Sequence, residues 1–230
     1  MKTDKNTTTD QRPPVCQAVR AVGIVKPKFN PQHAAFDKPS LDIRGTGFWL
    51  KTERQFVTCA HVVGDLVSRP IESAGMLVMG GNRFPYVRAT IQVLDIQHDL
   101  ALLSIHASED EIEKQVATGL ELTRQETTVS ERVAYAGFPF GNILLNQNHS
   151  PTYAEGNIGN DELNELSPKQ IQVSGQVAGG FSGAPIVLAN TPQCVVAILS
   201  NSPSEEVGHA NIFRGISWRH LGALCMLANS

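Results

Sequence analysis

The chain has 230 residues, a formal net charge of −3, 41% hydrophobic residues and 18% charged residues. This length supports one two-part unit with a large core. A mildly acidic chain without a basic run lacks the electrostatic footprint of a nucleic-acid-binding protein. No apolar stretch approaches the roughly 20 residues that span a bilayer. We therefore expect neither a nucleic-acid nor a membrane partner.

Residues 1–14 are polar and rich in threonine, and they end at Pro13-Pro14. This composition predicts a disordered tail. The tail has no apolar core followed by a cleavage site, so it is not a secretory signal as it stands. A chain from which a native leader had been removed would look the same.

Short β-rich segments separated by polar turns dominate the next part of the chain. The segments expected as strands are 48–50, 56–58, 76–79, 84–88, 91–94 and 100–105. A turn at Gly80-Gly81-Asn82 would join the third segment to the fourth. The hairpin formed by the first two segments leads into His61, and the last segment follows Asp99 directly.

The second half predicts another set of strands and one helix. Residues 107–128 contain no sustained apolar run and are expected to be a connection. Residues 142–169 are expected to hold a strand at most and to be mainly loop. The expected strands are 131–137, 170–176, 184–189 and 194–200. After Ser217 as N-cap, apolar residues recur at helical spacing, which predicts the only clear helix, packed on the strands.

Three segments carry candidate chemistry: one ends at His61, one contains Asp99, and the third is the glycine-flanked Ser182. Each alone is ambiguous, because glycine and serine favour turns and aspartate often caps them. Their order along the chain, His, Asp and Ser, is that of the chymotrypsin triad and differs from subtilisin and the α/β-hydrolases. The combination predicts a catalytic triad.

Each residue type serves a separate chemical need. The Ser182 hydroxyl is a weak nucleophile that needs a neighbouring base, and His61 can take and return a proton near neutral pH. Asp99 would fix the histidine tautomer and stabilise the imidazolium. The N–H groups of Gly180 and Ser182 are the expected oxyanion donors.

The sequence resembles the trypsin-like, chymotrypsin-fold serine proteases in four segments: Gly45-Thr46-Gly47-Phe48, residues 57–63, residues 99–103 and residues 180–187. Gly137-Phe138-Pro139-Phe140-Gly141 and Ile171-Gln172-Val173 are similar to the bacterial HtrA-type branch. The resemblance covers about residues 40–215.

The resemblance implies an all-β fold of two six-stranded antiparallel Greek-key barrels, packed perpendicular, with a C-terminal helix. The N-terminal barrel (15–106) would carry His61 and Asp99. The connection (107–128) would lead to the C-terminal barrel and helix (129–230), which carry Ser182. It further implies an endopeptidase that forms an acyl-enzyme on a protein or peptide substrate, without cofactor.

Two departures from the family pattern are informative. Trypsin-like enzymes activated by cleavage carry an acidic residue before the nucleophile, which pairs with the new N-terminal amine. Phe181 stands at that position here, so activation by N-terminal cleavage is not expected. HtrA-type proteins usually continue into a PDZ domain, whereas only one helix is expected after the last strand of this chain.

By the same resemblance, Gln176 would form the floor of the primary pocket, and Ser200, Asn201 and Ser202 its wall. Ser200 would also hydrogen-bond Asp99. The floor has no acidic residue, so a preference for Lys or Arg lacks its counter-charge. Pairing of Gln176 with barrel backbone alone is an equal alternative.

The four cysteines, Cys16, Cys59, Cys194 and Cys225, do not match the disulfide positions of secreted relatives. We expect reduced thiols and a cytoplasmic location. No two cysteines are closely spaced, so no metal site is expected. An alternative function remains: a catalytically silent protease-fold protein, or a protease controlled by a regulatory protein partner through residues 142–169.

Overall fold

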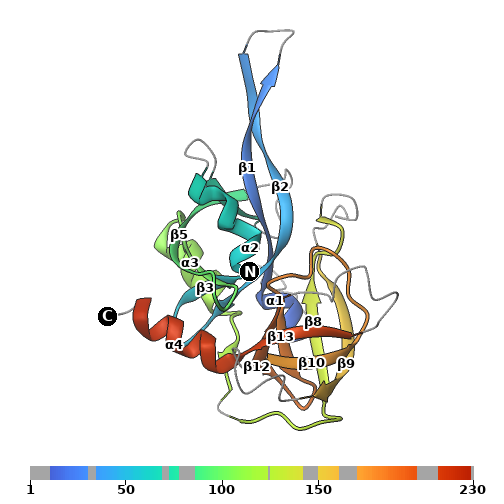
Figure 1. Ribbon diagram of the computed structural model, residues 1–230. Helices are drawn as coiled ribbons and strands as arrows, with labels where there is room; N and C mark the ends of the chain where they lie inside the picture. The colour runs from blue at the N-terminus through green and yellow to red at the C-terminus, as the bar shows by residue number, and fades with distance from the viewer. Residues whose placement is uncertain are drawn as a thin grey trace, which may run out of the picture.

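The structure is a computed structural model in which two β-barrels lie side by side with short helices around them (Figure 1). It describes residues 11–30, 35–68, 73–77, 86–123, 125–141, 150–160, 170–200 and 212–228. One core cluster contains residues of both barrels, such as Phe48 and Ile198, and a second fills the C-terminal barrel. Shared apolar packing therefore joins the two barrels.

The N-terminal barrel is closed and follows the order β1-β2-β3-β6-β5-β4. Its strands are β1 (Val19–Asn30), β2 (Ala35–Leu50), β3 (Gln55–Thr58), β4 (Ser73–Leu77), β5 (Tyr86–Asp95) and β6 (Leu100–Ile105). The ends of β1 and β2 extend away from the barrel as a long hairpin (Figure 1). The expected 80–82 turn lies outside the described residues.

The C-terminal barrel follows the order β11-β8-β9-β10-β13-β12, and pairing of β11 with β12 closes it. Its strands are β8 (Arg132–Gly137), β9 (Thr152–Asn160), β10 (Gln170–Gly175), β11 (Pro185–Leu188), β12 (Thr191–Leu199) and β13 (Ile212–Ser217). A short β7 (Glu121–Leu122) adds to β12 in parallel. The predicted class, two antiparallel barrels with a C-terminal helix, is confirmed.

Residues 142–169 were expected to hold a strand at most and to be mainly loop, and their described part contains strand β9, which lies in the barrel between β8 and β10. The sequence of β9 is polar, and Ile158 is its only fully buried residue. A strand held mainly by backbone hydrogen bonds on both sides shows little apolar alternation. Residues 142–149 and 161–169 lie outside the described residues.

The expectation of a single clear helix is wrong. The helices are α1 (Pro14–Ala18), α2 (Ala60–Val63), the 3₁₀ helix η1 (Gly64–Ser68), α3 (Glu109–Val116) and α4 (Trp218–Ala228). Helix α3 lies within the predicted connection and begins with a capping box. There, Glu111 Oε2 accepts hydrogen bonds from Ser108 N and Ser108 Oγ. This Ser-x-x-Glu pattern signals a helix start without a long apolar run.

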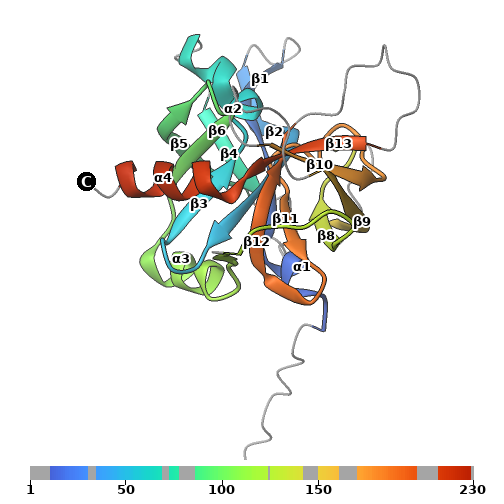
Figure 2. The ribbon, with the colours of Figure 1, turned by 60° about the horizontal axis from the view of Figure 1, so that its bottom comes forward.

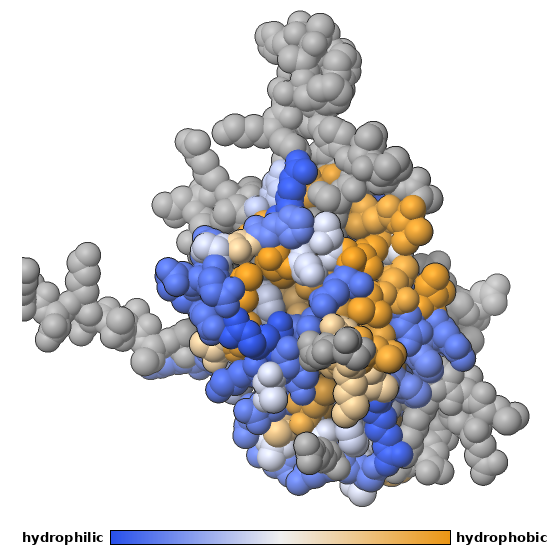
Figure 3. All heavy atoms as spheres, turned by 90° about the vertical axis from the view of Figure 1, so that its left-hand side faces the viewer, coloured by the Kyte–Doolittle hydropathy of each residue, from blue (hydrophilic) through white to orange (hydrophobic). Residues whose placement is uncertain are grey.

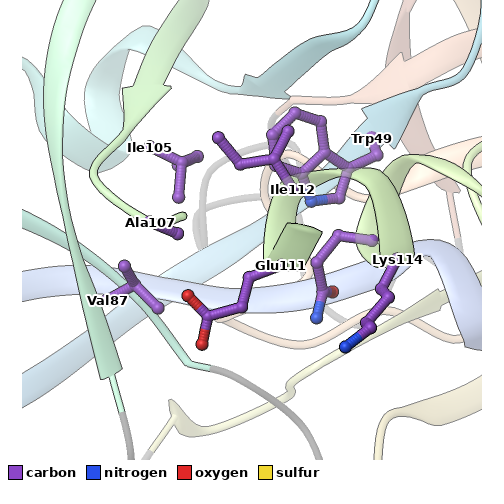
Figure 4. A pocket seen from close by; sticks show the side chains of 8 residues that line it. Trp49, Val87, Ile105, Ala107, Glu111, Ile112 and Lys114 are labelled. Atoms are coloured by element: carbon purple, nitrogen blue, oxygen red, sulfur yellow. The ribbon is translucent and has the colours of Figure 1, made fainter. Parts of the chain in front are cut away.

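A cavity of about 210 Å³ lies between α3 and the N-terminal barrel (Figure 4). Apolar side chains of Trp49, Val87, Ile105 and Ile112 line it, and none of the predicted site residues does. This cavity is therefore not formed by the residues of the predicted active site.

Helix α4 is the predicted C-terminal helix. It runs from β13 across the N-terminal barrel and contacts β5 and β12 (Figure 2). Ser217 Oγ accepts a hydrogen bond from Arg219 N at 3.4 Å, and Leu221, Leu224 and Cys225 are buried. No helix among the described residues is long and apolar enough to cross a membrane.

The far end of α4 leaves Met226 78% exposed and Leu227 70% exposed. The face of the molecule on this side carries an apolar area next to a polar one (Figure 3).

Two histidines fasten α4 to the N-terminal barrel. His220 of α4 stacks on His98, with ring centroids 4.4 Å apart, and His98 Nδ1 lies 2.6 Å from Asp95 Oδ2. Burial, and then the neighbouring His98, lower the pKa of His220, whereas Asp95 partly opposes the shift. The stack therefore favours neutral His220.

We predict that this stack makes folding stability sensitive to mild acid. The unfolded pKa of His220 is 6.5 and the folded pKa is lower, so the unfolded chain binds more protons between them and stability falls as pH drops through that window. His220→Phe keeps a ring for stacking. Between about pH 7.5 and 5.5, its melting temperature should fall less than that of wild type, by about 1–3 °C. Parallel melting curves would contradict the assignment.

Candidate active site

The three candidate catalytic residues come from separate segments. His61 lies in α2 directly after β3, Asp99 precedes β6, and Ser182 lies in the loop between β10 and β11. Strands β3 and β6 pair with Thr58 opposite Ala101. This register places the residues that follow β3 beside those that precede β6. Backbone pairing within one barrel thus brings His61 and Asp99 together.

The Asp99 carboxylate holds the His61 ring in one orientation. His61 Nδ1 lies 2.8 Å from Asp99 Oδ2 and 2.9 Å from Oδ1, and His61 N donates to Oδ1 at 2.9 Å. An ionised carboxylate only accepts hydrogen bonds, so Nδ1 carries the proton and Nε2 keeps its lone pair. The His61 side chain is 44% exposed. Nε2 is therefore the ring nitrogen that can act as a base.

Hydrogen bonds keep Asp99 ionised. Partial burial alone would raise the pKa of this carboxyl, but the hydrogen bonds from His61 and from Ser200 outweigh burial and hold the pKa below its usual value. Ser200 Oγ donates to Asp99 Oδ2, which is the contact expected for Ser200. A tight turn supports the geometry, since Asp99 has φ +54° and its carbonyl accepts from Ala60 N at 3.1 Å.

The Ser182 hydroxyl points to a different acceptor. Ser182 Oγ donates to the main-chain carbonyl of Ser200 at 3.0 Å, and the described part of the chain shows no hydrogen bond from it to His61. The hydroxyl must therefore turn about its Cα–Cβ bond before His61 Nε2 can accept its proton. Catalytic hydrogen bonds are often loose in unliganded structures and tighten when substrate binds.

The nucleophile loop presents the N–H groups of Gly180 and Ser182 without an acceptor among the described residues. The N–H groups of Phe181, Gly183 and Ala184 donate to carbonyls of Ala178, Leu199 and Phe181. Those of Gly180 and Ser182 donate to nothing among the described residues. These two are the donors that the sequence predicts for an oxyanion.

The carbonyl groups of the same loop are held by other partners. Gly179 O accepts from Phe140 N at 2.6 Å, and Gly180 O accepts from Thr46 Oγ1 at 2.8 Å. Gly180 has φ +101°, and a Cβ there would lie 2.2 Å from Phe138 O. Glycine is required at this position because of both the conformation and the close approach.

Sequence reasoning missed Thr46, which connects the two barrels at this point. The residue is fully buried in β2. Its Oγ1 donates to Gly180 O and accepts from Phe138 N at 3.1 Å, while its N–H donates to Ser182 O at 2.8 Å. The segment Gly45-Thr46-Gly47-Phe48 was recognised in the sequence, but it supported only the family resemblance and did not predict these hydrogen bonds of Thr46.

Phe181 anchors the nucleophile loop by apolar packing. Its side chain is 3% exposed and meets Tyr135 edge to face, with ring centroids 5.6 Å apart. Tyr135 Oη donates to Gln176 O at 2.9 Å, and burial raises the pKa of Tyr135 to about 12, so it stays neutral. Apolar packing of Phe181 therefore takes the place of the ion pair that cleavage-activated enzymes form between this position and a new N-terminus.

The expected specificity residues are only partly placed. Gln176 is exposed and its carbonyl is used by Tyr135, which fits the structural alternative as well as a pocket floor. Ser200 lies beside Asp99 and Ser182, while Asn201 and Ser202 lie outside the described residues. The assignment of the pocket stays a prediction.

Comparison with known proteins agrees with this architecture. The chain is 29% identical over 158 residues to the uncharacterized protein y4bJ of Sinorhizobium fredii (strain NBRC 101917 / NGR234). The aligned region covers 67% of this chain and 21% of that protein. The structure is similar to that of the HtrA-type protease AlgW with decapeptide, with a TM-score of 0.69 and 18% identity. That match covers 93% of this chain and 65% of AlgW, and at this identity it shows the fold alone.

The chain spans about a fifth of the curated relative and about two thirds of the HtrA-type neighbour. A profile of the trypsin-like peptidase domain matches residues 45–198, which include all three candidate catalytic residues. The chain therefore belongs to the trypsin-like peptidase domain family.

Proposed function

We propose that this protein is a serine endopeptidase that hydrolyses peptide bonds through an acyl-enzyme on Ser182. The observation that carries the proposal is the assembly across two barrels of an oriented base and a nucleophile loop. His61 Nδ1 is bound to Asp99, and Ser182 follows a loop whose Gly180 and Ser182 N–H groups have no partner in the described chain. Membership of the trypsin-like peptidase family supports the same reaction class.

The reaction proceeds in two halves. Ser182 Oγ turns from the Ser200 carbonyl, gives its proton to His61 Nε2 and attacks the substrate carbonyl. The N–H groups of Gly180 and Ser182 bind the resulting oxyanion. Asp99 stabilises the imidazolium, which then protonates the leaving amine. Water, deprotonated by His61, hydrolyses the acyl-enzyme and restores Ser182.

The substrate class follows from this chemistry and from the fold. The HtrA-type neighbour was solved with a decapeptide, which supports a peptide or protein substrate. We propose Gln176, Ser200, Asn201 and Ser202 around the primary pocket. We also propose a cytoplasmic location, supported by four free cysteines, three of them buried.

One observation favours the alternative, a protease controlled by a partner. The Ser182 hydroxyl donates its hydrogen bond to Ser200 O rather than to His61. A partner or substrate that changed this loop could complete the triad. Residues 142–169 remain the proposed place for such control.

We predict that Ser182→Ala and His61→Ala each abolish peptidase turnover while leaving the melting temperature nearly unchanged. Removing one member of the triad should lower kcat by about 10⁴–10⁶. The measurement is mass spectrometry of cleavage products from a peptide library, alongside fluorophosphonate labelling of Ser182. Equal cleavage by wild type and Ser182→Ala would show that the triad assignment is wrong. Labelling without turnover would favour the partner-controlled alternative.

We predict that Thr46→Val lowers kcat by about 10- to 100-fold with little change in KM. Valine cannot donate to Gly180 O or accept from Phe138 N, so the oxyanion loop loses the link that fixes its direction. Complete loss of one oxyanion donor costs about 10²–10³ in kcat, and misalignment should cost less. Thr46→Ser keeps the hydroxyl and is the control. Unchanged kcat in Thr46→Val would contradict the role of these hydrogen bonds, because valine keeps the volume of threonine and lacks only the hydroxyl.

We predict that activity requires no particular free N-terminus. Because Phe181 is packed against Tyr135, the loop needs no new amine to hold it. Deletion of residues 1–10 should leave kcat/KM for a peptide substrate within a few-fold of the full chain. A strict dependence on one processed N-terminus would disprove this interpretation.

A further inference from the structure

The proposed catalytic histidine and aspartate have a thiol neighbour that the proposed reaction does not use. Cys59 lies two residues before His61, is fully buried, and its Sγ donates to Leu199 O at 3.3 Å. One donor atom each from Cys59, His61 and Asp99 lie within 4.8 Å of one another. Sequence spacing gave no reason to expect this cluster, because Asp99 is far along the chain and no second cysteine is near.

We propose that Cys59, His61 and Asp99 form an inhibitory binding site for a soft divalent transition-metal ion such as zinc. The inhibitory part rests on the proposed peptidase function, whereas binding itself does not. Zinc takes sulfur, nitrogen and oxygen ligands at about 2.3, 2.0–2.1 and 2.0–2.2 Å. Donor atoms around one tetrahedral ion are roughly 3.3–3.8 Å apart by these lengths, so the three groups need only small shifts.

The charges at this site balance when the ion binds. A divalent ion, the Cys59 thiolate and the Asp99 carboxylate sum to zero, and His61 binds as neutral imidazole. A neutral set avoids the large cost of a net charge in a partly buried position. In the step itself, the Cys59 S–H bond breaks, a sulfur–metal bond forms, and the thiol proton passes to solvent. A water molecule would complete the four ligands.

An ion can reach this position from the side of His61. The His61 side chain is 44% exposed and the Asp99 side chain 25% exposed, whereas Cys59 has no exposed surface. A rotation of the His61 ring therefore opens the path to the thiol. In the bound state, the Cys59 sulfur would be the most buried ligand, and the His61 ring would lie on the solvent side of the ion.

Metal binding at this position would stop catalysis by changing the histidine tautomer. In the free chain Nδ1 carries the proton and Nε2 is the base. When Nδ1 binds the ion, the ring proton must move to Nε2, which then cannot accept the proton of Ser182. The ion removes the base that activates Ser182, so kcat should fall as the site fills.

Binding is tested first, in the Ser182→Ala background, so that the result does not depend on peptidase activity. Titration with Cd²⁺ should produce the ultraviolet charge-transfer band of a cadmium–thiolate bond at one ion per chain, and Zn²⁺ should displace it. Adding Cys59→Ala or Cys59→Ser should remove the band. Adding Cys194→Ala, which changes the cysteine that is not fully buried, should leave the band unchanged.

The size of the effect follows from the loss of a direct ligand. Even partners that only orient a ligand contribute about 10–100-fold to metal affinity, so losing the Cys59 sulfur should cost at least about 100-fold. A band that survives both Cys59 variants, or that disappears with Cys194→Ala, would overturn the proposed site. Circular dichroism verifies that each variant is folded. If Cys59→Ala does not fold, Cys59→Ser is used in its place.

Inhibition is tested second, with the wild-type chain, which keeps Ser182. Zinc should lower kcat reversibly, with recovery in EDTA, and the inhibitory concentration should rise at least about 100-fold in Cys59→Ala or Cys59→Ser, each compared with its own metal-free rate. Equal zinc sensitivity with and without Cys59 would overturn the inhibitory role. If the wild-type chain shows no turnover, the proposed function fails, while the cadmium titration still decides whether the site exists.

Discussion

The active-site geometry depends on the buried hydrogen bonds that Thr46 makes between the two barrels. Each barrel closes by its own backbone pairing, and neither pairing fixes where Ser182 lies relative to His61. Thr46 joins β2 to Gly180, Ser182 and Phe138 at once. Thr46 itself is fully buried, so breaking one of these bonds leaves its polar group unpaired, at about 1–3 kcal/mol. Together with the shared apolar core, they couple the base to the nucleophile.

The β-rich character was predictable from apolar segments of strand length before His61 and after Asp99, whereas the two-barrel class followed from the resemblance of the motifs to the trypsin-like proteases. The candidate triad could be named from the sequence because its residue types follow a defined order. Thr46 was not predictable in its role, since its partners lie 92 and 134 residues away. Only the pairing of the barrels brings such partners together. A glycine-flanked threonine in isolation predicts a turn.

The failures of prediction share a physical cause. The bounds of strand β9 were not predicted and helix α3 was missed, because both are held by features that leave little apolar pattern. For β9 these are two neighbouring strands, and for α3 they are the Ser108–Glu111 capping box and contacts with β2. Periodicity detects an element through the face that it buries, so elements with small buried faces are missed.

Replacement of an ion pair by packing changes what the nucleophile loop responds to. A charge pair with a new N-terminus would couple the loop to a cleavage event. Phe181 against Tyr135 couples it instead to the interior of the C-terminal barrel, which is set when the chain folds. The remaining freedom lies in the Ser182 hydroxyl, which donates to Ser200 O and, in the proposed reaction, would turn to His61 Nε2. Control of such a site acts most directly on the histidine, and Cys59 is placed where an ion could hold it.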